Sequence, residues 1–219
     1  MEIIRCDNQT VVCVKPAGVL STDEPGGLPE KLRTALGDPA APLYTVHRLD
    51  RAVGGAMLLA RTRHAASDLG RQVMDGRFRK EYLAVVHGAP EAERGMFADL
   101  LLRDKAARVS RVVPEAQPGA QEAVLDYAVL ARSGGLSLVR VTLRTGRTHQ
   151  IRVQFSSRGL PLVGDRKYGA AEDGCPIALW SWRLAFDQPK TGERIEVESP
   201  PPEITPWTVF ERDRELWNL

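Results

Sequence analysis

The sequence predicts a single α+β domain over residues 1–219, built on a largely antiparallel mixed sheet with flanking helices. Two β-rich runs, residues 122–130 and 136–143, are joined by a short link that contains glycine, which is typical of an antiparallel hairpin. A second pair of such runs lies at residues 178–186 and 194–197. Three further segments show helical spacing of apolar residues, and neither a repeat nor a linker divides the chain, which favours one domain.

The first strand and the first helix are separated by a sharp break. Residues 10–14 are a β-rich run that ends in the K-P-A-G of residues 15–18, where Pro and Gly stop the strand. A helix is expected over residues 29–36, because Pro29 suits a first helical turn and Gly37 is a natural stop. The segment between strand and helix is expected to be a loop.

Extended and helical segments then alternate. Residues 43–46 are expected to be extended, and residues 56–60 are a short apolar run typical of a buried strand. Thr62 can cap a helix that runs to about residue 75. A strand is expected over residues 80–88, which are rich in β-branched and aromatic side chains.

The later segments are less regular. Residues 90–119 lack a clear period, and we expect a partly extended, partly mobile excursion whose basic side chains suit either an RNA backbone or solvent. These side chains are Arg103, Lys105, Arg108 and Arg111. A helix is expected over residues 148–158, with Thr148 as its cap and Gly159 as its stop. The prolines at residues 200–202 are expected to end the regular structure.

Composition places the chain among globular proteins. Apolar residues make up 43% and charged residues 26% of the 219 residues, which argues against disorder, and the net charge of +2 does not by itself indicate a nucleic-acid partner. No apolar stretch is long enough to span a membrane, and the N-terminus lacks a signal-peptide layout. Cys6, Cys13 and Cys175 have neither metal-ligand nor disulfide spacing, so we expect reduced thiols in a cytoplasmic protein that has no membrane partner.

One short stretch concentrates charged side chains between apolar runs. In residues 46–51 a single carboxylate, Asp50, lies among two guanidinium groups and an imidazole. Two glycines follow, so Asp50 is expected where an extended segment gives way to a turn, a place that can present one side chain to a cleft. The neighbouring cations favour its ionised form. Alternatively, Asp50 pairs with Arg48 or Arg51 on the surface.

A second stretch, residues 145–152, leads into the last expected helix. Helical spacing gives this helix one polar face and one apolar face, the second of which suits packing on a sheet. The polar face holds His149, Arg152 and Ser156, and the apolar face holds Ile151 and Phe155. The start of the helix, next to Arg147, is expected to suit an anion. Alternatively, this is an ordinary amphipathic helix whose polar residues face solvent.

These motifs, in this order, resemble those of the RluA-like RNA pseudouridine synthases. Residues 47–50 match the family's H-R-L-D motif, and residues 146–152 match its G-R-T-H-Q-I-R motif. The other matches are K-P-x-G at residues 15–18, K-x-Y at 80–82, G-x-P-[IL]-x-G-D-x-x-Y at 159–168, and Q-P-K-T-G-E at 188–193, which is close to the family's H-P-x-T-G-E. The likeness runs over residues 11–202, almost the whole chain.

The resemblance implies a pseudouridine synthase fold with a central RNA-binding cleft. It implies that the chain isomerises specific uridines in structured RNA (rRNA, tRNA or both) to pseudouridine, with no metal or other cofactor. By the same resemblance, Asp50 is the catalytic aspartate, Tyr82 lies against the target base, and Arg152 is the cation that pairs with the aspartate. The expected substrate contacts are His47, Arg48, Arg51, Lys80, Arg147, His149 and Gln150. RNA is then the partner, and we expect a monomer.

Three features depart from the family pattern. The family usually continues its aspartate motif with x-x-T-S-G, where this chain has V-G-G at residues 53–55, so a hydroxyl is lost beside the expected catalytic loop. The family's last strands often contain L-H-A, where this chain has L-W-S at residues 179–181. The small basic RNA-binding domain that many members carry is not expected before Val11.

Two other functions stay open. The first is a catalytically idle RNA-binding protein with the same fold. The second is a carboxylate-dependent nucleosidase or glycosidase, which would need a second catalytic carboxylate. Asp165 and Glu81 are the candidates for that second group by their place in the motifs.

Overall fold

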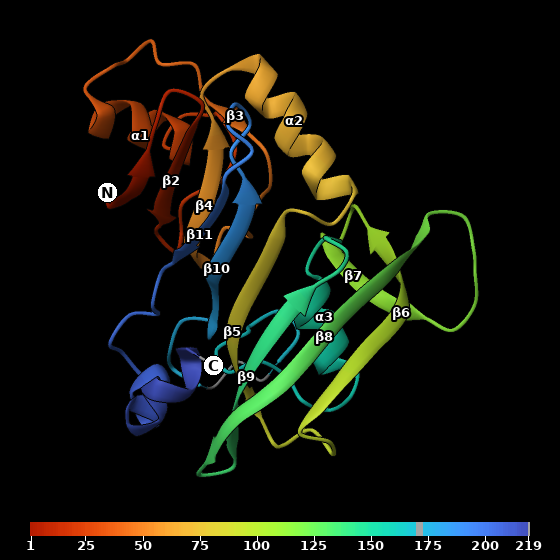
Figure 1. Ribbon diagram of the computed structural model, residues 1–219. Helices are drawn as coiled ribbons and strands as arrows, with labels where there is room; N and C mark the ends of the chain where they lie inside the picture. The colour runs from red at the N-terminus through yellow and green to blue at the C-terminus, as the bar shows by residue number, and fades with distance from the viewer. Residues whose placement is uncertain (170–172, 219) are drawn as a thin grey trace. The chain divides into compact units, whose positions relative to one another are not determined.

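The computed structural model describes residues 1–169 and 173–218, which form two compact units (Figure 1). Unit 1 comprises Met1–Glu81 and Trp180–Pro200, and unit 2 comprises Tyr82–Leu179 and Pro201–Leu219. Both units combine strands with helical segments, so the predicted α+β class is confirmed. The assignment of the whole chain to a single domain stays a prediction.

Unit 1 is built around β4, in which every residue is buried. The strands of this unit are β1 (Ile3–Cys6), β2 (Thr10–Lys15), β3 (Tyr44–Thr45), β4 (Gly54–Ala60), β10 (Leu179–Asp187) and β11 (Arg194–Glu198). β2 and β3 pair with β4 in antiparallel fashion, and β10 pairs with the start of β4 in parallel fashion. β1 pairs with β2, and β11 pairs with β10. The expected strands of this unit are confirmed, and β1 is an additional strand that the sequence pattern missed.

The two helices of unit 1 begin and end close to the predicted positions. They are α1 (Leu28–Leu36) and α2 (Arg63–Met74). Gly37 ends α1 with a φ of 68°, in the left-handed region that glycine tolerates. The hydroxyl of Thr62 accepts the N–H of Ala65 at 3.0 Å and so caps α2 as predicted. The buried side of α2 packs on the apolar core of the unit.

Unit 2 contains a set of long antiparallel strands (Figure 1). They are β5 (Arg79–His87), β6 (Arg94–Asp104), β7 (Val109–Val113), β8 (Ala120–Ser133) and β9 (Leu136–Leu143). The predicted hairpin of β8 and β9 is confirmed, and its turn uses Gly134 and Gly135 at φ values of 58° and 79°. β6 pairs with both β8 and β7, and β5 neighbours β9.

Strand and helix signals are weak in unit 2, so one prediction there is right only in its extended part and another is wrong. Residues 90–119, expected to be an excursion, contain the regular hairpin of β6 and β7. Only Phe97 and Leu101 of β6 are buried, four positions apart, so the sequence shows no clean period of two. The regular structure also continues past the prolines, as the 3₁₀ segment η1 (Trp207–Asn218), which is interrupted by a kink at Phe210. This segment contacts β8 and buries Trp207 and Phe210.

The last α-helix is shorter than predicted and is capped differently. It is α3 (Gln150–Ser156), and its cap is His149 at a φ of 58° instead of Thr148. The physical reason is the side chain of Gln150, whose Oε1 accepts the N–H of Arg147 at 3.0 Å and thereby closes the turn before the helix. The apolar face is as predicted, since Phe155 packs 5.0 Å from Phe97 of β6, ring centre to ring centre.

Candidate functional site

The predicted site residues fall into two groups, one in each unit. In unit 1, Asp50 lies in the loop between β3 and β4, and the backbone on both sides of it is held. The hydroxyl of Ser21 donates to the carbonyl of Leu49 at 2.8 Å and accepts the N–H of the same residue at 3.1 Å. On the other side, the carbonyl of Arg51 accepts the N–H of Gly18 at 2.7 Å. The loop after β2 therefore fixes the backbone around Asp50.

Lys15 lies fully buried under the same loop. Its ammonium group donates to the carbonyls of Pro16 at 2.9 Å, Val19 at 2.7 Å and Arg51 at 3.3 Å. Burial lowers the pKa of Lys15 to about 8, while the negative charge of Asp50 raises it. The K-P-x-G segment was predicted as a strand break and as a family motif. Its lysine also supplies a buried cation that bonds twice to its own loop and once to the Asp50 loop, at Arg51.

His47 is buried and ties the same loop to the central strand. Its Nε2 accepts the N–H of Leu58 at 3.0 Å, so the ring proton is on Nδ1, which meets no acceptor among the described residues. Its ring meets the ring of Phe78 edge to face at 5.1 Å. Burial, and secondarily the charge of Lys80, lowers the pKa of His47 to about 3. His47 is thus a neutral core residue, and its predicted contact with RNA stays a prediction.

Lys80, also predicted to contact RNA, is buried beside the same aromatic ring. Its ammonium nitrogen lies 5.7 Å from the centre of the Phe78 ring. Burial lowers the pKa of Lys80. By contrast, Arg48 and Arg51 are exposed, and Arg51 donates from Nε to the carbonyl of Gly18 at 2.9 Å. Of the cations in this group, the two arginines are therefore accessible to a polyanion.

The buried, neutral imidazole makes stability depend on pH. A folded-state pKa of about 3 against 6.5 in the unfolded chain means that the unfolded state binds the extra proton between these values. The contribution is fully present above pH 6.5 and is lost as the pH falls toward 3, at about 1.4 kcal/mol per unit. We expect the stability advantage of wild type over His47→Gln, whose amide oxygen can accept the same N–H, to shrink on acidification, measured by urea unfolding between about pH 7 and about pH 5. An advantage that does not change with pH would contradict a buried neutral His47.

The two sequence departures from the family pattern in this unit meet in space. A Cβ atom added at Gly54 would lie 2.4 Å from the ring of Trp180 and 3.1 Å from the carbonyl of Lys15. The indole is held by its N–H, which donates to the carbonyl of Ser199 at 2.9 Å. Trp180 therefore occupies the space into which any side chain at position 54 would extend, and the glycine there accommodates the tryptophan.

This contact predicts strong coupling between the two positions. We expect Gly54→Ser to destabilise the protein by about 1–3 kcal/mol through overpacking, and much less when Trp180→His is also present. A double-mutant cycle from urea unfolding measures the coupling. Gly70→Ser is the matched control, since a Cβ at Gly70 meets nothing within 4 Å. If the effects of Gly54→Ser and Trp180→His simply add, the two departures are unrelated.

In unit 2, Arg152 forms a buried, two-pronged ion pair with Asp165. Nε and one terminal nitrogen of Arg152 lie 2.8 Å and 2.7 Å from the two carboxylate oxygens. The Asp165 side chain has no exposed surface, and the Arg152 side chain is 8% exposed. Burial alone would raise the pKa of Asp165, but Arg152 and the N–H groups of Lys167 and Tyr168 outweigh it and hold that pKa below its usual value. Asp165 is thus engaged as a charged structural partner of Arg152.

The predicted polar face of α3 meets Tyr168. His149 Nδ1 lies 2.7 Å from the Tyr168 hydroxyl, and the Arg152 guanidinium lies 5.2 Å from the centre of the Tyr168 ring. The hydroxyl of Ser156 donates to the Tyr168 carbonyl at 2.5 Å. His149, Arg152 and Ser156 thus all meet Tyr168, although His149 precedes α3 in a left-handed conformation and is not placed there by helical spacing. The part played by Tyr168, 19 positions after His149, was not predicted.

The other predicted site residues of unit 2 differ in exposure. Gln150 is buried, and its amide bonds to Thr145, to the N–H of Arg147 and to the carbonyl of Val124, so it braces the turn before α3. Arg147 is exposed and donates from Nε to the carbonyl of Glu122 at 2.8 Å. Tyr82 lies on β5 and is 6% exposed.

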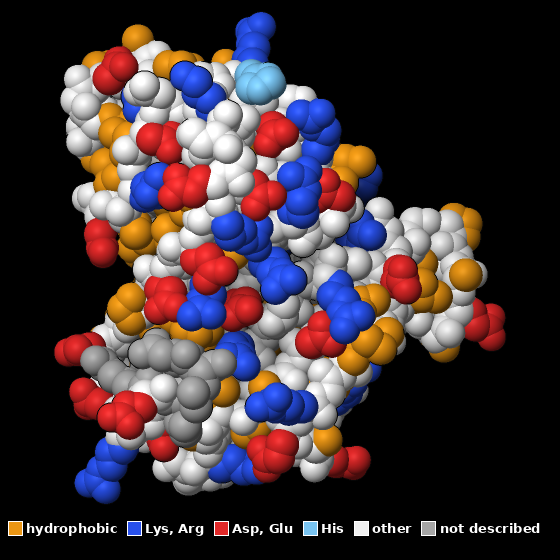
Figure 2. Space-filling model, viewed as in Figure 1, with side chains coloured by type: hydrophobic (Ala, Val, Ile, Leu, Met, Phe, Trp, Pro, Cys, Tyr) orange, Lys and Arg blue, Asp and Glu red, His pale blue; other side chains and the backbone are white. Residues whose placement is uncertain are grey.

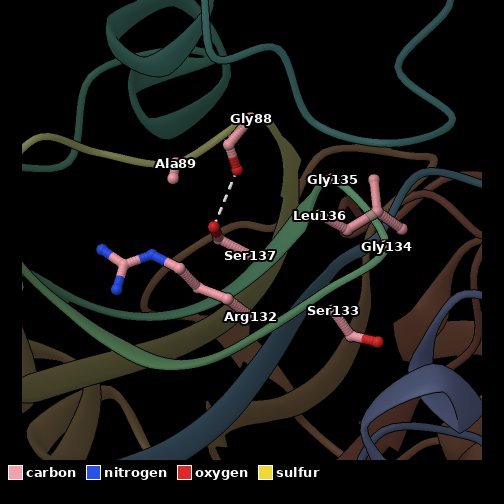
Figure 3. A pocket seen from close by; sticks show the side chains of 8 residues that line it. All are labelled: Gly88, Ala89, Arg132, Ser133, Gly134, Gly135, Leu136 and Ser137. Carbon is pink, nitrogen blue, oxygen red and sulfur yellow. Dashed lines mark hydrogen bonds between the residues drawn. The ribbon is translucent and has the colours of Figure 1, made fainter.

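A cavity of about 330 Å³ lies elsewhere in unit 2, at the turn between β8 and β9 (Figure 3). None of the predicted site residues lines it. Two of its polar side chains are already engaged, because the hydroxyl of Ser137 donates to the carbonyl of Gly88 at 2.7 Å and Arg132 pairs with Glu93.

Charge and metal-binding groups add little to this description. Figure 2 shows Lys and Arg side chains interspersed with Asp and Glu over the visible face, in keeping with the net charge of +2. Across residues 1–169 and 173–218, no cluster of three or more His, Cys, Asp or Glu side chains could hold a metal ion. Within the same residues, no helix is long and apolar enough to cross a membrane.

The chain is similar to proteins of one family. The family model described as RNA pseudouridylate synthase matches residues 9–157. An RNA pseudouridine synthase of Bacillus subtilis, YlyB, is 35% identical over 93% of this chain and 70% of its own length. The ribosomal large subunit pseudouridine synthase D of Pseudomonas aeruginosa is 33% identical over 99% of this chain and 74% of its own length.

A solved structure of a pseudouridylate synthase domain has the same fold as this chain. Human RNA pseudouridylate synthase domain containing 1 superposes with a TM-score of 0.77 at 26% identity, covering 93% of this chain and 84% of that one. The chain spans about two thirds of the length of several curated relatives, for example 64% of the ribosomal large subunit pseudouridine synthase C of Pasteurella multocida.

Proposed function

Since this chain belongs to the RNA pseudouridylate synthase family, we propose that it converts specific uridines of ribosomal or transfer RNA to pseudouridine with Asp50 as its catalytic residue. Isomerisation of RNA uridine is the activity of the family, and the catalytic residue and the target are our proposal. Relatives named as ribosomal large subunit pseudouridine synthases C and D support ribosomal RNA as a target.

In the proposed reaction the target uridine is turned out of its stack into the site, at a cost of roughly a few kcal/mol. The ring of Tyr82 recovers part of this by stacking, on the order of 1–3 kcal/mol. The N1–C1′ bond breaks, the uracil turns over, and C5 bonds to C1′, after which C5 loses its proton and N1 gains one. The Asp50 carboxylate acts on the substrate, and Arg152 contributes its positive charge to the reaction.

The observation that carries this assignment is the support of the Asp50 backbone. Ser21 holds the residue before Asp50 through both its N–H and its carbonyl, while Gly18 and Lys15 hold the residue after it. A solvated surface aspartate needs no such support. A group that must act on one atom of a substrate does, because small errors in its position lower the rate steeply.

The test is to incubate the protein with unmodified ribosomal and transfer RNA and to analyse the nucleosides and the released bases. Pseudouridine formed without free uracil is the expected result. Free uracil would indicate hydrolysis, and binding with neither product would indicate an idle RNA-binding protein. Mapping pseudouridine positions in cells with and without the gene then identifies the target.

A further inference from the structure

Tyr168 joins three segments of unit 2 that are far apart in the sequence. Its ring packs against the apolar cluster of Leu101, Ala123 and Val153, to which β6, β8 and α3 contribute one residue each. Its hydroxyl accepts the N–H of Ser110, on β7, at 2.7 Å. Its backbone N–H donates to Asp165 at 3.2 Å. Tyr168 thus connects the β6–β7 hairpin and α3 through its side chain and the Asp165 loop through its backbone.

The hydroxyl of Tyr168 is held from two sides. Because its oxygen accepts from the backbone of Ser110, its proton can be donated to His149 Nδ1, which lies 2.7 Å away. The hydroxyl of Ser110 in turn donates to the carbonyl of Thr148 at 2.7 Å, next to His149. Lys167, the neighbour of Tyr168, donates to the carbonyl of Arg108 at 3.0 Å. These bonds leave the tyrosine ring little freedom to turn.

The fixed ring lies beside the guanidinium of Arg152, 5.2 Å from the guanidinium carbon. The carboxylate of Asp165 accepts two hydrogen bonds from the edge of the same guanidinium, at 2.7 Å and 2.8 Å. Such an edge-on pair restricts rotation out of the guanidinium plane less than rotation within it. The ring adds a second contact to this guanidinium. Arg152 is thus held by the carboxylate of Asp165 and by a neighbouring aromatic ring.

We propose that Tyr168 is a positioning residue for Arg152: its ring orients the guanidinium, and its hydroxyl anchors the ring to β7 and His149. The proposal rests on the proposed function in so far as Arg152 takes part in the reaction. The orientation of Arg152 by the ring is a separate claim that can be measured without any turnover.

The test uses Tyr168→Leu, which removes the ring, and Tyr168→Phe, which keeps the ring and removes the hydroxyl. Tyr127→Leu is the matched control, because Tyr127 is a buried tyrosine of the same unit that packs on Phe97 and Phe155. We expect Tyr168→Leu to lower kcat at least about 10-fold with KM within about 3-fold, and Tyr168→Phe, whose ring is no longer anchored to Ser110 and His149, to lower kcat by a smaller factor. The control should lose stability while keeping kcat per folded molecule.

A second measurement is independent of activity. The Nε–H signal of Arg152, assigned by its loss in Arg152→Lys, should be slow to exchange and shifted by the ring current in wild type, and should show a smaller ring-current shift in Tyr168→Phe, where the ring is less fixed. In Tyr168→Leu this signal should lose its ring-current shift and exchange faster. An unchanged Arg152 signal in Tyr168→Leu would overturn the proposal, as would equal losses of kcat in Tyr168→Leu and Tyr127→Leu. If wild type forms no pseudouridine, the proposed function fails while the signal still decides this proposal.

Discussion

Replacement of Asp50 by asparagine should reduce pseudouridine formation by at least about 10³-fold, the order expected when a group that acts on the substrate in the transition state is removed. Asparagine keeps the shape of the side chain but can neither attack nor take a proton. RNA affinity should stay within about 3-fold, because the exposed cations Arg48, Arg51 and Arg147 still meet phosphates and one like charge is removed. Rates of pseudouridine formation and filter binding measure the two effects separately.

The same substitution should have only a small effect on stability. The charge of Asp50 raises the pKa of the buried Lys15, so its loss removes a favourable interaction with that ammonium group. The backbone clamps from Ser21 and Gly18 remain, so the loss should be about 1 kcal/mol or less at neutral pH. Asp38→Asn, an exposed aspartate outside both groups of site residues, is the control. Turnover by Asp50→Asn close to the wild-type rate would refute the assigned role of Asp50.

The fold was predictable where local chemistry and tertiary structure agree. The strand in residues 56–60 is apolar at every position because it is buried on both faces as β4, and the cap at Thr62 and the stop at Gly37 are local devices. The β8–β9 hairpin has a clear link of two glycines in its turn. In such segments the neighbours in the sequence determine the structure.

The secondary-structure predictions are wrong where contacts between residues distant in the sequence determine the local structure. β6 buries only two large side chains, Phe97 against Tyr127 and Phe155, and Leu101 against Ala123 and Val153, so its pattern resembles that of a loop until its partners are known. Residues after the prolines are helical because Trp207 and Phe210 pack in the protein interior, and no local sequence pattern predicts this burial. The cap of α3 is His149 and not the predicted Thr148, because the side chain of Gln150 accepts a hydrogen bond from the N–H of Arg147 in the preceding turn.

The site follows the same division. The motifs predicted roles for Asp50, His149 and Arg152, and these roles stay predictions. Helical spacing relates Arg152 and Ser156 within α3, whereas His149 lies before the helix. The supports of Asp50 were not foreseen, since Ser21 is 28 positions from Leu49 and Lys15 is 36 positions from Arg51. His47 and Lys80 were interpreted as RNA contacts by their position in the motifs. The structure adds that both are buried in unit 1, which a sequence does not display, and their contact with RNA stays a prediction.

Replacement of Arg152 by alanine should both stop turnover and destabilise the protein by about 3–5 kcal/mol, because it leaves the Asp165 carboxylate unpaired in a buried place. The matched control is Arg144→Ala, which breaks an ion pair of the same two-pronged geometry with Asp126 on the surface of the same unit. The side chains of that pair are 59% and 36% exposed, so the control should cost less than about 1 kcal/mol. Urea unfolding of both variants gives the comparison.

The pH dependence separates loss of the ion pair from general damage. In wild type the pKa of Asp165 is below its usual value of 3.8, so its contribution to stability is complete above that pH and is lost as the pH falls through the folded-state pKa. In Arg152→Ala, burial dominates and should raise this pKa above the unfolded value, so acidification toward it should stabilise the variant. The pair Arg152→Met with Asp165→Asn removes both charges while an amide oxygen still accepts the N–H groups of Lys167 and Tyr168, and it should regain stability without turnover. Activity in this double variant, or an Arg152→Ala protein as stable as the Arg144→Ala control, would refute the role given to the pair.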